Sequence, residues 1–256
     1  MLNRPLVVST PLIRGMLNPW AFLFCQKDVK PMIRTAILVD GGFYRKRANH
    51  LWGPLTAEER ADELQAYCHT HIHLKDGGEK RILYRIFYYD CSPITKRSVF
   101  HPLTKKNIRL DQSDTFTWSD TFLEELKRRR KFALRLGELA GTPCYNLKPE
   151  ATKELLLGKR RLDEITENDF LFNSPQKGVD MRIGIDIASL AYKKQVDQII
   201  LIAGDSDFVP AAKLARREGI DFVLDPMGAQ IRPDLFEHID GLESPWKKGK
   251  PNHLKK

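Results

Sequence analysis

The stretch Thr35-Ala-Ile-Leu-Val-Asp-Gly-Gly-Phe43 decides the fold, because a short apolar run ends abruptly in an aspartate and two glycines. An apolar run of this length indicates a buried strand. Similar apolar periods predict further strands at 81–89, 132–136, 198–203 and 221–224, and helices at 56–74, 121–131, 180–194 and 208–218. Strands that alternate with helices pair in parallel through right-handed crossovers. We therefore expect an α/β fold, a three-layer α/β/α sandwich with a central, mainly parallel sheet.

The composition is that of a protein with a packed core. The chain has 256 residues, of which 42% are hydrophobic, and this content disfavours global disorder. No apolar run approaches the ~18 residues of a membrane span. The four cysteines form no C-x-x-C pair, which argues against a zinc ribbon or a disulfide framework and favours a reducing compartment. We therefore expect a soluble, cytoplasmic protein.

The chain divides into a long core and two unlike ends. We expect one domain over residues 32–240, interrupted by polar insertions at about 91–120 and 141–176. Residues 1–31 are predicted to be a flexible leader or an over-extended start, with Met32 as the alternative first residue. Most of the net charge of +9 lies in this leader and in residues 241–256, which are predicted to form a basic flexible tail. Such ends attract polyanions such as RNA, although two solvated ends explain the charge equally well.

Aspartates stand where the predicted strands end. Asp40 follows the first strand, Asp205 and Asp207 follow the strand at 198–203, and Asp180 begins a helix. In open α/β sheets, ligands bind beyond the carboxyl ends of the strands. Carboxylates gathered there repel one another unless a cation compensates, and Mg²⁺ or Mn²⁺ is the usual cation. Such a metal activates water and stabilises charge on a scissile phosphate.

Helix capping is the competing explanation for these acids. Asp180 and Asp207 each stand at the start of a predicted helix, where an aspartate often accepts hydrogen bonds from the first turn. For either residue alone, capping is the better explanation. Acids at three separate strand-to-helix junctions together favour a shared metal site.

Several motifs together resemble the NYN domain in its LabA-like group. They are the stretch 35–43 quoted above, the strand Tyr84-Arg-Ile-Phe-Tyr-Tyr-Asp90, the string Lys177-Gly-Val-Asp180 and the string Ile202-Ala-Gly-Asp-Ser-Asp-Phe-Val-Pro210. The resemblance covers roughly residues 35–240, with the two insertions matching poorly. It implies a PIN-like fold related to metal-dependent ribonucleases.

The resemblance also implies site residues. Asp40, Asp180, Asp205 and Asp207 would be the catalytic acids and the metal ligands. Asp186 matches the family as well, but six residues along a helix turn it about 240° away from Asp180. We therefore expect Asp186 to have a structural role or to contact a metal ligand, and not to bind the metal itself. The family often has Asn after the first Asp-Gly, whereas this chain has Gly42, so no ligand is assigned there.

Residues beside the acids are expected to contact RNA. Arg45 and Arg47 follow Asp40 directly and would bind phosphates, and Phe43 and Tyr44 would stack on bases. Lys177 and Ser206 complete the expected substrate contacts, with Ser206 orienting a water or a phosphate oxygen.

Two further patterns each allow two interpretations. The basic run at 127–131 lines an RNA path or forms the polar face of an amphipathic helix, and both are equally supported. His69 and His73 lie four residues apart, as in some zinc sites, but no Glu lies between them as in H-E-x-x-H. A solvated helix end is therefore the preferred interpretation of the histidines. Gly41, Gly42 and Gly204 would let a substrate backbone approach closely.

The first functional hypothesis is a metal-dependent endoribonuclease that hydrolyses RNA phosphodiesters with Mg²⁺ or Mn²⁺. The second is a catalytically weak RNA-binding or regulatory module that kept the fold. The third is a phosphatase with an aspartyl nucleophile, which usually needs a second Asp at the position that Gly42 occupies. RNA is the expected partner, no membrane partner is expected, and a homodimer is left open.

Overall fold

The computed structural model describes residues 32–74, 80–93, 98–139, 143–173, 176–246 and 249, and these belong to one compact unit that spans Met32–Lys256. The predicted leader, residues 1–31, lies outside the described residues, as do all five lysines of the predicted tail. The side chains at positions 139, 176 and 177 are likewise outside the description.

A seven-stranded sheet forms the centre of this unit. Its strands, in spatial order, are β11 (Gly241–Leu242), β10 (Asp221–Asp225), β9 (Gln198–Ile202), β1 (Met32–Asp40), β2 (Lys80–Cys91), β5 (Phe132–Leu139) and β8 (Gln176–Lys177). All neighbours pair in parallel except β5 and β8, which are antiparallel. The predicted α/β fold with a mainly parallel sheet is therefore confirmed. The first strand is central because its apolar run is buried from both sides.

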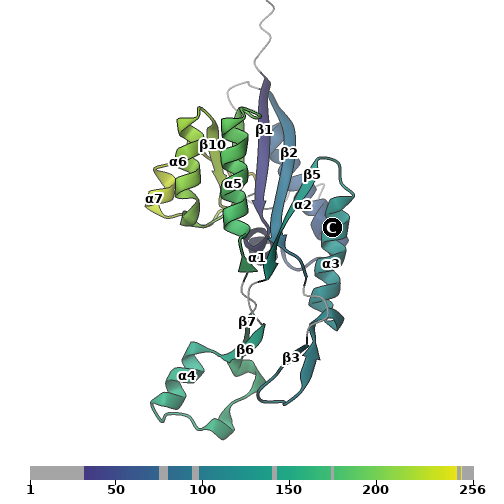
Figure 1. The fold of residues 1–256 in the computed structure, drawn as a ribbon, viewed down its shortest axis with the longest axis vertical. Coiled ribbons are helices and arrows are strands. Elements are labelled where there is room, and N and C mark those ends of the chain that lie inside the picture. Colours follow the sequence, from purple (N-terminus) through teal and green to yellow (C-terminus); the bar gives the residue numbers. More distant parts are fainter. Residues whose placement is uncertain are drawn as a thin grey trace, which may run out of the picture. The chain divides into compact units, whose positions relative to one another are not determined.

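Helices cover both faces of the sheet (Figure 1). One face packs against α1 (Gly41–Trp52), α2 (Ala57–His73) and α3 (Asp114–Lys127), and the other against α5 (Val179–Tyr192), α6 (Val209–Arg217) and α7 (Pro233–Phe236). Side chains of β1 alternate between the two layers: Ile37 and Val39 belong to the first core, and Ala36 and Leu38 to the second. None of the described helices is long and apolar enough to cross a membrane.

The helix ends follow local capping rules. Thr56 and Glu59 form a complete capping box at the start of α2. The helix α1 was not predicted, since Gly41 and Gly42 open it and its apolar period is weak. Asp40 begins it by accepting a hydrogen bond from the backbone N–H of Phe43 at 3.1 Å.

The described parts of the two insertions form hairpins that contact each other. The first contains a hairpin of β3 (Ser98–Phe100) and β4 (Asn107–Arg109), and the second contains a hairpin of β6 (Cys144–Leu147) and β7 (Phe170–Asn173) with α4 (Pro149–Leu156) between its strands. Four 3₁₀ turns complete the described elements: η2 (Leu110–Gln112), η3 (Leu162–Glu164), η4 (Glu167–Asp169) and η5 (Ser206–Phe208). The ring of His101 lies 4.5 Å from that of Tyr145 and 5.0 Å from that of Phe170, which joins the hairpins. We call this pair of insertions the hairpin module.

The domain continues past residue 240, so the predicted boundary of the tail is wrong. Gly241–Leu242 forms β11 beside β10, and Glu243 forms an ion pair with Arg81 at 2.5 Å. Trp246 is only 3% exposed and packs edge-on against Tyr67, with ring centroids 5.0 Å apart. Apolar burial and a paired charge therefore fix the chain at least as far as Trp246.

A buried polar network lies under this C-terminal segment. His71 is fully buried, and its Nε2 lies 2.9 Å from Asp225 Oδ2, which also accepts a hydrogen bond from the hydroxyl of Tyr67 at 2.5 Å. His71 thus differs from His69 and His73 of the same helix, since His69 is half-buried and His73 is exposed. Burial alone would lower the pKa of His71, but hydrogen bonds with Asp225 and Glu243 outweigh burial and raise this pKa above its ordinary value.

The raised pKa of His71 predicts how stability changes with pH. A histidine whose pKa is higher in the folded state binds its proton more tightly there. Its contribution to the free energy of unfolding is therefore complete below about pH 6.5 and is lost as the pH rises through the folded-state pKa. Urea unfolding of the native protein and of His71→Gln, from about pH 6 to about pH 9, measures this. A difference between the two proteins that stays constant with pH would contradict it.

Gly41 makes room for the aromatic end of β2. A Cβ at this position would lie 2.4 Å from the hydroxyl oxygen of Tyr88 and 2.6 Å from the backbone oxygen of Tyr89. The expected role of Gly41 in admitting a substrate is therefore replaced by a packing role. The backbone oxygen belongs to a central strand and cannot move aside cheaply.

Replacing Gly41 with Ala should therefore destabilise the fold by about 1–3 kcal/mol through overpacking. Gly184→Ala is the matched control, because it also lies in a helix and a Cβ there meets nothing within 4 Å. The control should gain about 0.5–1 kcal/mol from its better helix propensity. Denaturant unfolding of both variants measures the change in the free energy of unfolding, which should be a loss for Gly41→Ala and a gain for Gly184→Ala. A more stable Gly41→Ala would refute the packing argument.

Candidate acidic active site

The acids gather where the order of strands reverses. From β1 the chain builds β2 and β5 on one side, and only later β9 and β10 on the other. Such a switch point leaves a crevice beyond the carboxyl ends of the two central strands. Val39 pairs in register with Ile202, so Asp40 and the loop that carries Asp205 leave the sheet side by side.

Asp40 has the most perturbed carboxyl of the site. Its side chain is half-buried at the end of β1. Burial raises its pKa to about 6, the backbone N–H groups of Phe43 and Gly42 oppose the rise, and the charges of Asp180 and Asp90 add to it. Asp40 is therefore a capping residue that also carries unfavourable negative charge.

Asp180, Asp205 and Asp207 complete the acidic group. Asp180 lies in the first turn of α5, behind Gly178, whose positive φ of 80° turns the chain into the helix. Burial raises the pKa of Asp180, and the charges of Asp205 and Asp207 raise it further. The four carboxyls thus interact electrostatically, although they come from three junctions far apart in the sequence.

Capping at the third junction belongs to Asp205 and not to Asp207. The Asp205 Oδ1 accepts a hydrogen bond from the backbone N–H of Asp207 at 3.1 Å and begins η5. The interpretation of Asp207 as the cap is therefore wrong. Asp207 is exposed, and its carboxylate has no structural hydrogen bond to another described residue.

An open hollow of about 580 Å³ lies over these acids. Its polar lining comes from Asp40, Asp180, Asp205, Ser206, Lys46 and Arg232, and its floor includes Phe43 and Gly204. We call it the acidic hollow. Two cations at the rim of a cluster of carboxylates suit a ligand that itself carries both signs, such as a metal ion bound to phosphate.

The donor set fits a hard divalent cation. Oxygen ligands from carboxylates are what Mg²⁺ and Mn²⁺ prefer. Burial first, and neighbouring carboxylates second, raise the pKa of Asp40 and of Asp180, so a cation would stabilise the charged form of both. Within the described residues, no ion pair neutralises these two carboxylates, and no three acidic, histidine or cysteine side chains are already close enough to enclose one ion. The acids would therefore have to rotate toward a shared cation.

Comparison with known proteins finds a family match within this segment. Residues 150–231 match the family model described as the NYN domain. This part of the chain is therefore similar to NYN domains. The match includes Asp180, Asp205 and Asp207, while Asp40 lies before it on β1.

Two other comparisons add little to the NYN assignment. One solved structure, a protein of unknown function from Vibrio parahaemolyticus, is 14% identical, with a TM-score of 0.41 over 85% of this chain and 94% of that one. Among curated proteins, none matches this chain. The LabA-like group remains an expectation from the motifs alone.

Only some of the residues predicted to contact RNA lie in the acidic hollow. Tyr44 is fully buried and donates a hydrogen bond to Glu63 at 3.1 Å, so its expected stacking on a base is wrong. Phe43 does line the acidic hollow, where its ring fills the space above Gly204 that a Cβ would need. Gly204 therefore accommodates Phe43 itself. Ser206 lines the hollow, and the side chain of Lys177 lies outside the described residues.

The arginines after Asp40 are used within the protein. Arg45 forms an ion pair with Asp90 at 3.0 Å, and Arg47 donates a hydrogen bond to the backbone oxygen of Met227 at 3.0 Å. Lys46, between them, is the α1 residue that reaches the acidic hollow. Lys46 shares a helix face with Phe43 and Gly42, because residues three and four apart lie on the same side of a helix.

Asp90 is an acid close to the site that was not expected to take part in it, and its charge raises the pKa of Asp40. It is 3% exposed at the end of β2, and it accepts hydrogen bonds from the hydroxyl of Tyr88 and the backbone N–H of Cys91 at 3.0 and 2.8 Å. Its position after a predicted strand was the available signal. Arg232, in the loop before α7, gave no signal in the sequence.

Asp186 has contacts that fit the structural role expected for it. The hydroxyl of Tyr89 donates to Asp186 Oδ2 at 2.8 Å, and Arg135 pairs with the same oxygen at 2.9 Å. Asp186 therefore ties α5 to β2 and β5. The carboxylate is committed to these two partners.

The basic run at 127–131 is largely neutralised by its own neighbours. Lys127 and Arg128 pair with Glu124 and Glu125, and Arg129 pairs with Asp62 at 2.8 Å. Lys131 donates to the backbone oxygen of Leu83. These contacts favour the interpretation of the run as the polar end of α3.

The raised pKa of Asp40 makes a prediction about stability. A carboxyl with a pKa of about 6 when folded and about 3.9 when unfolded costs nothing when protonated in both states, and the cost grows as the pH rises between the two values. Asp40→Asn keeps the cap on Phe43 and removes the charge. It should therefore stabilise the metal-free protein by about 1–3 kcal/mol at neutral pH and by little below about pH 4.

Denaturant unfolding in EDTA at both pH values measures this gain. Asp163→Asn is the matched control, because the Asp163 carboxylate is 67% exposed and lies on the hairpin module. The control should change little at either pH. A neutral-pH loss of stability in Asp40→Asn would show that its charge is already compensated.

Proposed function

We propose that this protein is a metal-dependent endoribonuclease. The observation that carries the proposal is the pair Asp40 and Asp180, whose pKa values are both raised and which share a hollow at the switch point of the sheet. Perturbed carboxyls in a crevice are typical of catalytic sites. NYN domains are generally nucleases that bind RNA, which supports the same reaction.

Asp40, Asp180, Asp205 and Asp207 would hold the divalent cation, Mg²⁺ or Mn²⁺. When bound, the cation supplies a water of lowered pKa and neutralises charge on the phosphate. Lys46 and Arg232 at the rim attract the phosphate through their positive charge. Ser206 offers a hydroxyl to orient a phosphate oxygen or a water.

The test is cleavage of a labelled single-stranded RNA by the purified protein in Mn²⁺ or Mg²⁺, compared with EDTA. Asp205→Asn should lower cleavage by at least about 100-fold, because it removes a charged ligand at the reacting centre. Asparagine still accepts the Asp207 N–H, so the loop should persist. RNA binding should be unchanged or tighter, since a charge that repels phosphate is lost.

Asp163→Asn serves again as the exposed control and should cut RNA like the native protein. An Asp205→Asn variant that still cuts would refute the assignment. RNA bound in a salt-sensitive way but never cut, in either metal, would favour the binding module over the nuclease. Cleavage of a single-stranded DNA of the same sequence, tested alongside, decides whether the 2′-hydroxyl is required.

A further inference from the structure

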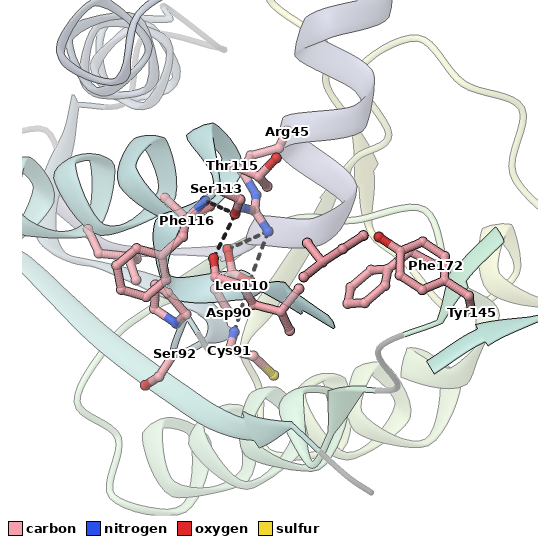
Figure 2. Close-up of a pocket in the computed structure, with 14 residues that line it drawn as sticks. Arg45, Asp90, Cys91, Ser92, Leu110, Ser113, Thr115, Phe116, Tyr145 and Phe172 are labelled. Carbon is pink, nitrogen blue, oxygen red and sulfur yellow. Dashed lines mark hydrogen bonds and ion pairs between the residues drawn. The ribbon is translucent and has the colours of Figure 1, made fainter. Parts of the chain in front are cut away.

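A second pocket lies beside the acidic hollow and is built mainly by the hairpin module and α3. It encloses about 420 Å³ beyond the carboxyl end of β2 (Figure 2). Its walls include Arg45 of α1, Asp90 of β2, Phe116 of α3, Tyr145 of β6 and Phe172 of β7. We call it the aromatic pocket. The sheet and its helices alone would not close it.

Aromatic rings supply flat surfaces in this pocket. Tyr145 and Phe172 are cross-strand partners in the hairpin of β6 and β7, with ring centroids 5.3 Å apart. Phe172 is 37% exposed although it is a large apolar residue. Tyr145 beside it is half-buried, so the pair offers partly exposed ring surface to a ligand in the pocket.

The charges in the aromatic pocket cancel. Arg45 and Asp90 are its charged lining residues among those described, and they pair with each other at 3.0 Å. Figure 2 shows this pair together with the hydrogen bond from Cys91 to Asp90. A neutral, aromatic pocket with hydroxyls from Thr115 and Ser119 suits an uncharged planar group that carries hydrogen-bonding edges. It does not suit a phosphate, which the acidic hollow with its cations would take.

The two cavities are neighbours through α1 and the central strands. Lys46 lines the acidic hollow, and Arg45, the residue before it, lines the aromatic pocket. Asp40 pairs in register with Tyr89, and Asp90 is the next residue of that strand. Adjacent strands lie about 4.8 Å apart, so the acids of one cavity and the paired charges of the other are separated by roughly one strand.

We infer that the aromatic pocket receives one unpaired nucleobase of the RNA whose phosphate lies in the acidic hollow. This inference rests on the proposed function and adds a recognition element to it. A base can enter only when it is unstacked and unpaired, so the preferred substrate is a single strand or a loop. Selection of the base falls to Tyr145 and Phe172 for stacking and to the hydroxyls for its edges.

The test measures binding without cleavage. Affinity for a short single-stranded RNA is measured by fluorescence anisotropy in EDTA, first with intact RNA and then with one abasic site moved along the strand. In the native protein, the abasic site at one position should weaken binding by about tenfold or more, the size of one lost base–aromatic stack. Phe172→Ala should bind the intact RNA with a similarly reduced affinity. The abasic site should then cause no further loss of affinity in this variant, because both changes remove the same contact.

Leu171→Ala is the matched control. Leu171 is the adjacent residue of β7, is 56% exposed, and points to the opposite face of the strand. It should bind RNA like the native protein. Phe172→Leu keeps the apolar volume without the ring, so it separates loss of stacking from loss of folding and should match Phe172→Ala.

Each outcome bears on the proposal. Two results would overturn the aromatic pocket as a base site, even when the native protein cuts RNA. One is equal RNA affinity in all variants, and the other is a loss of affinity at the abasic site that is also seen in Phe172→Ala. A base-dependent response lost in both Phe172 variants supports the pocket, even when no metal produces cleavage. The failure of the nuclease proposal is therefore distinguishable from the failure of this one.

Discussion

Repulsion among carboxylates at one edge of a rigid sheet is the constraint on which the site depends. β1 and β9 are buried and paired along their lengths, so Asp40 and the loop that carries Asp205 cannot move apart without unpairing the sheet. Negative charge held in this way is relieved by a proton or by a cation. Burial and the charges of Asp180 and Asp90 together raise the pKa of Asp40 at this edge of the sheet.

The sheet was predictable because its central strands are visible in the sequence as short runs of apolar residues. The runs that became β1, β9 and β10 are apolar for nearly their whole length, and burial on both faces demands that pattern. The helix α1 was missed because two glycines open it and charged residues fill it, so its apolar period is short. It forms because Asp40 caps it and because Tyr44 and Ala48 are buried against the sheet.

The candidate site was predictable only in part. The positions of its acids follow from the local sequence, whereas the roles of other residues depend on partners far along the chain. Four acids at strand ends could be read from their positions, since the fold itself brings such positions together. The roles of Tyr44, Arg45 and Arg47 could not, because each depends on a partner far along the chain: Glu63, Asp90 and Met227. The hairpin module was likewise hidden in polar sequence, although Tyr145, Phe170 and Phe172 are its apolar signature.

The C-terminal segment has a practical consequence for how the protein is handled. A chain shortened at residue 240, where the motifs end, would remove Glu243 from Arg81 and Trp246 from Tyr67. A buried arginine and an uncovered aromatic surface would then face solvent together, a combination that promotes aggregation. Fusion partners and affinity tags at this end are therefore best attached beyond Trp246.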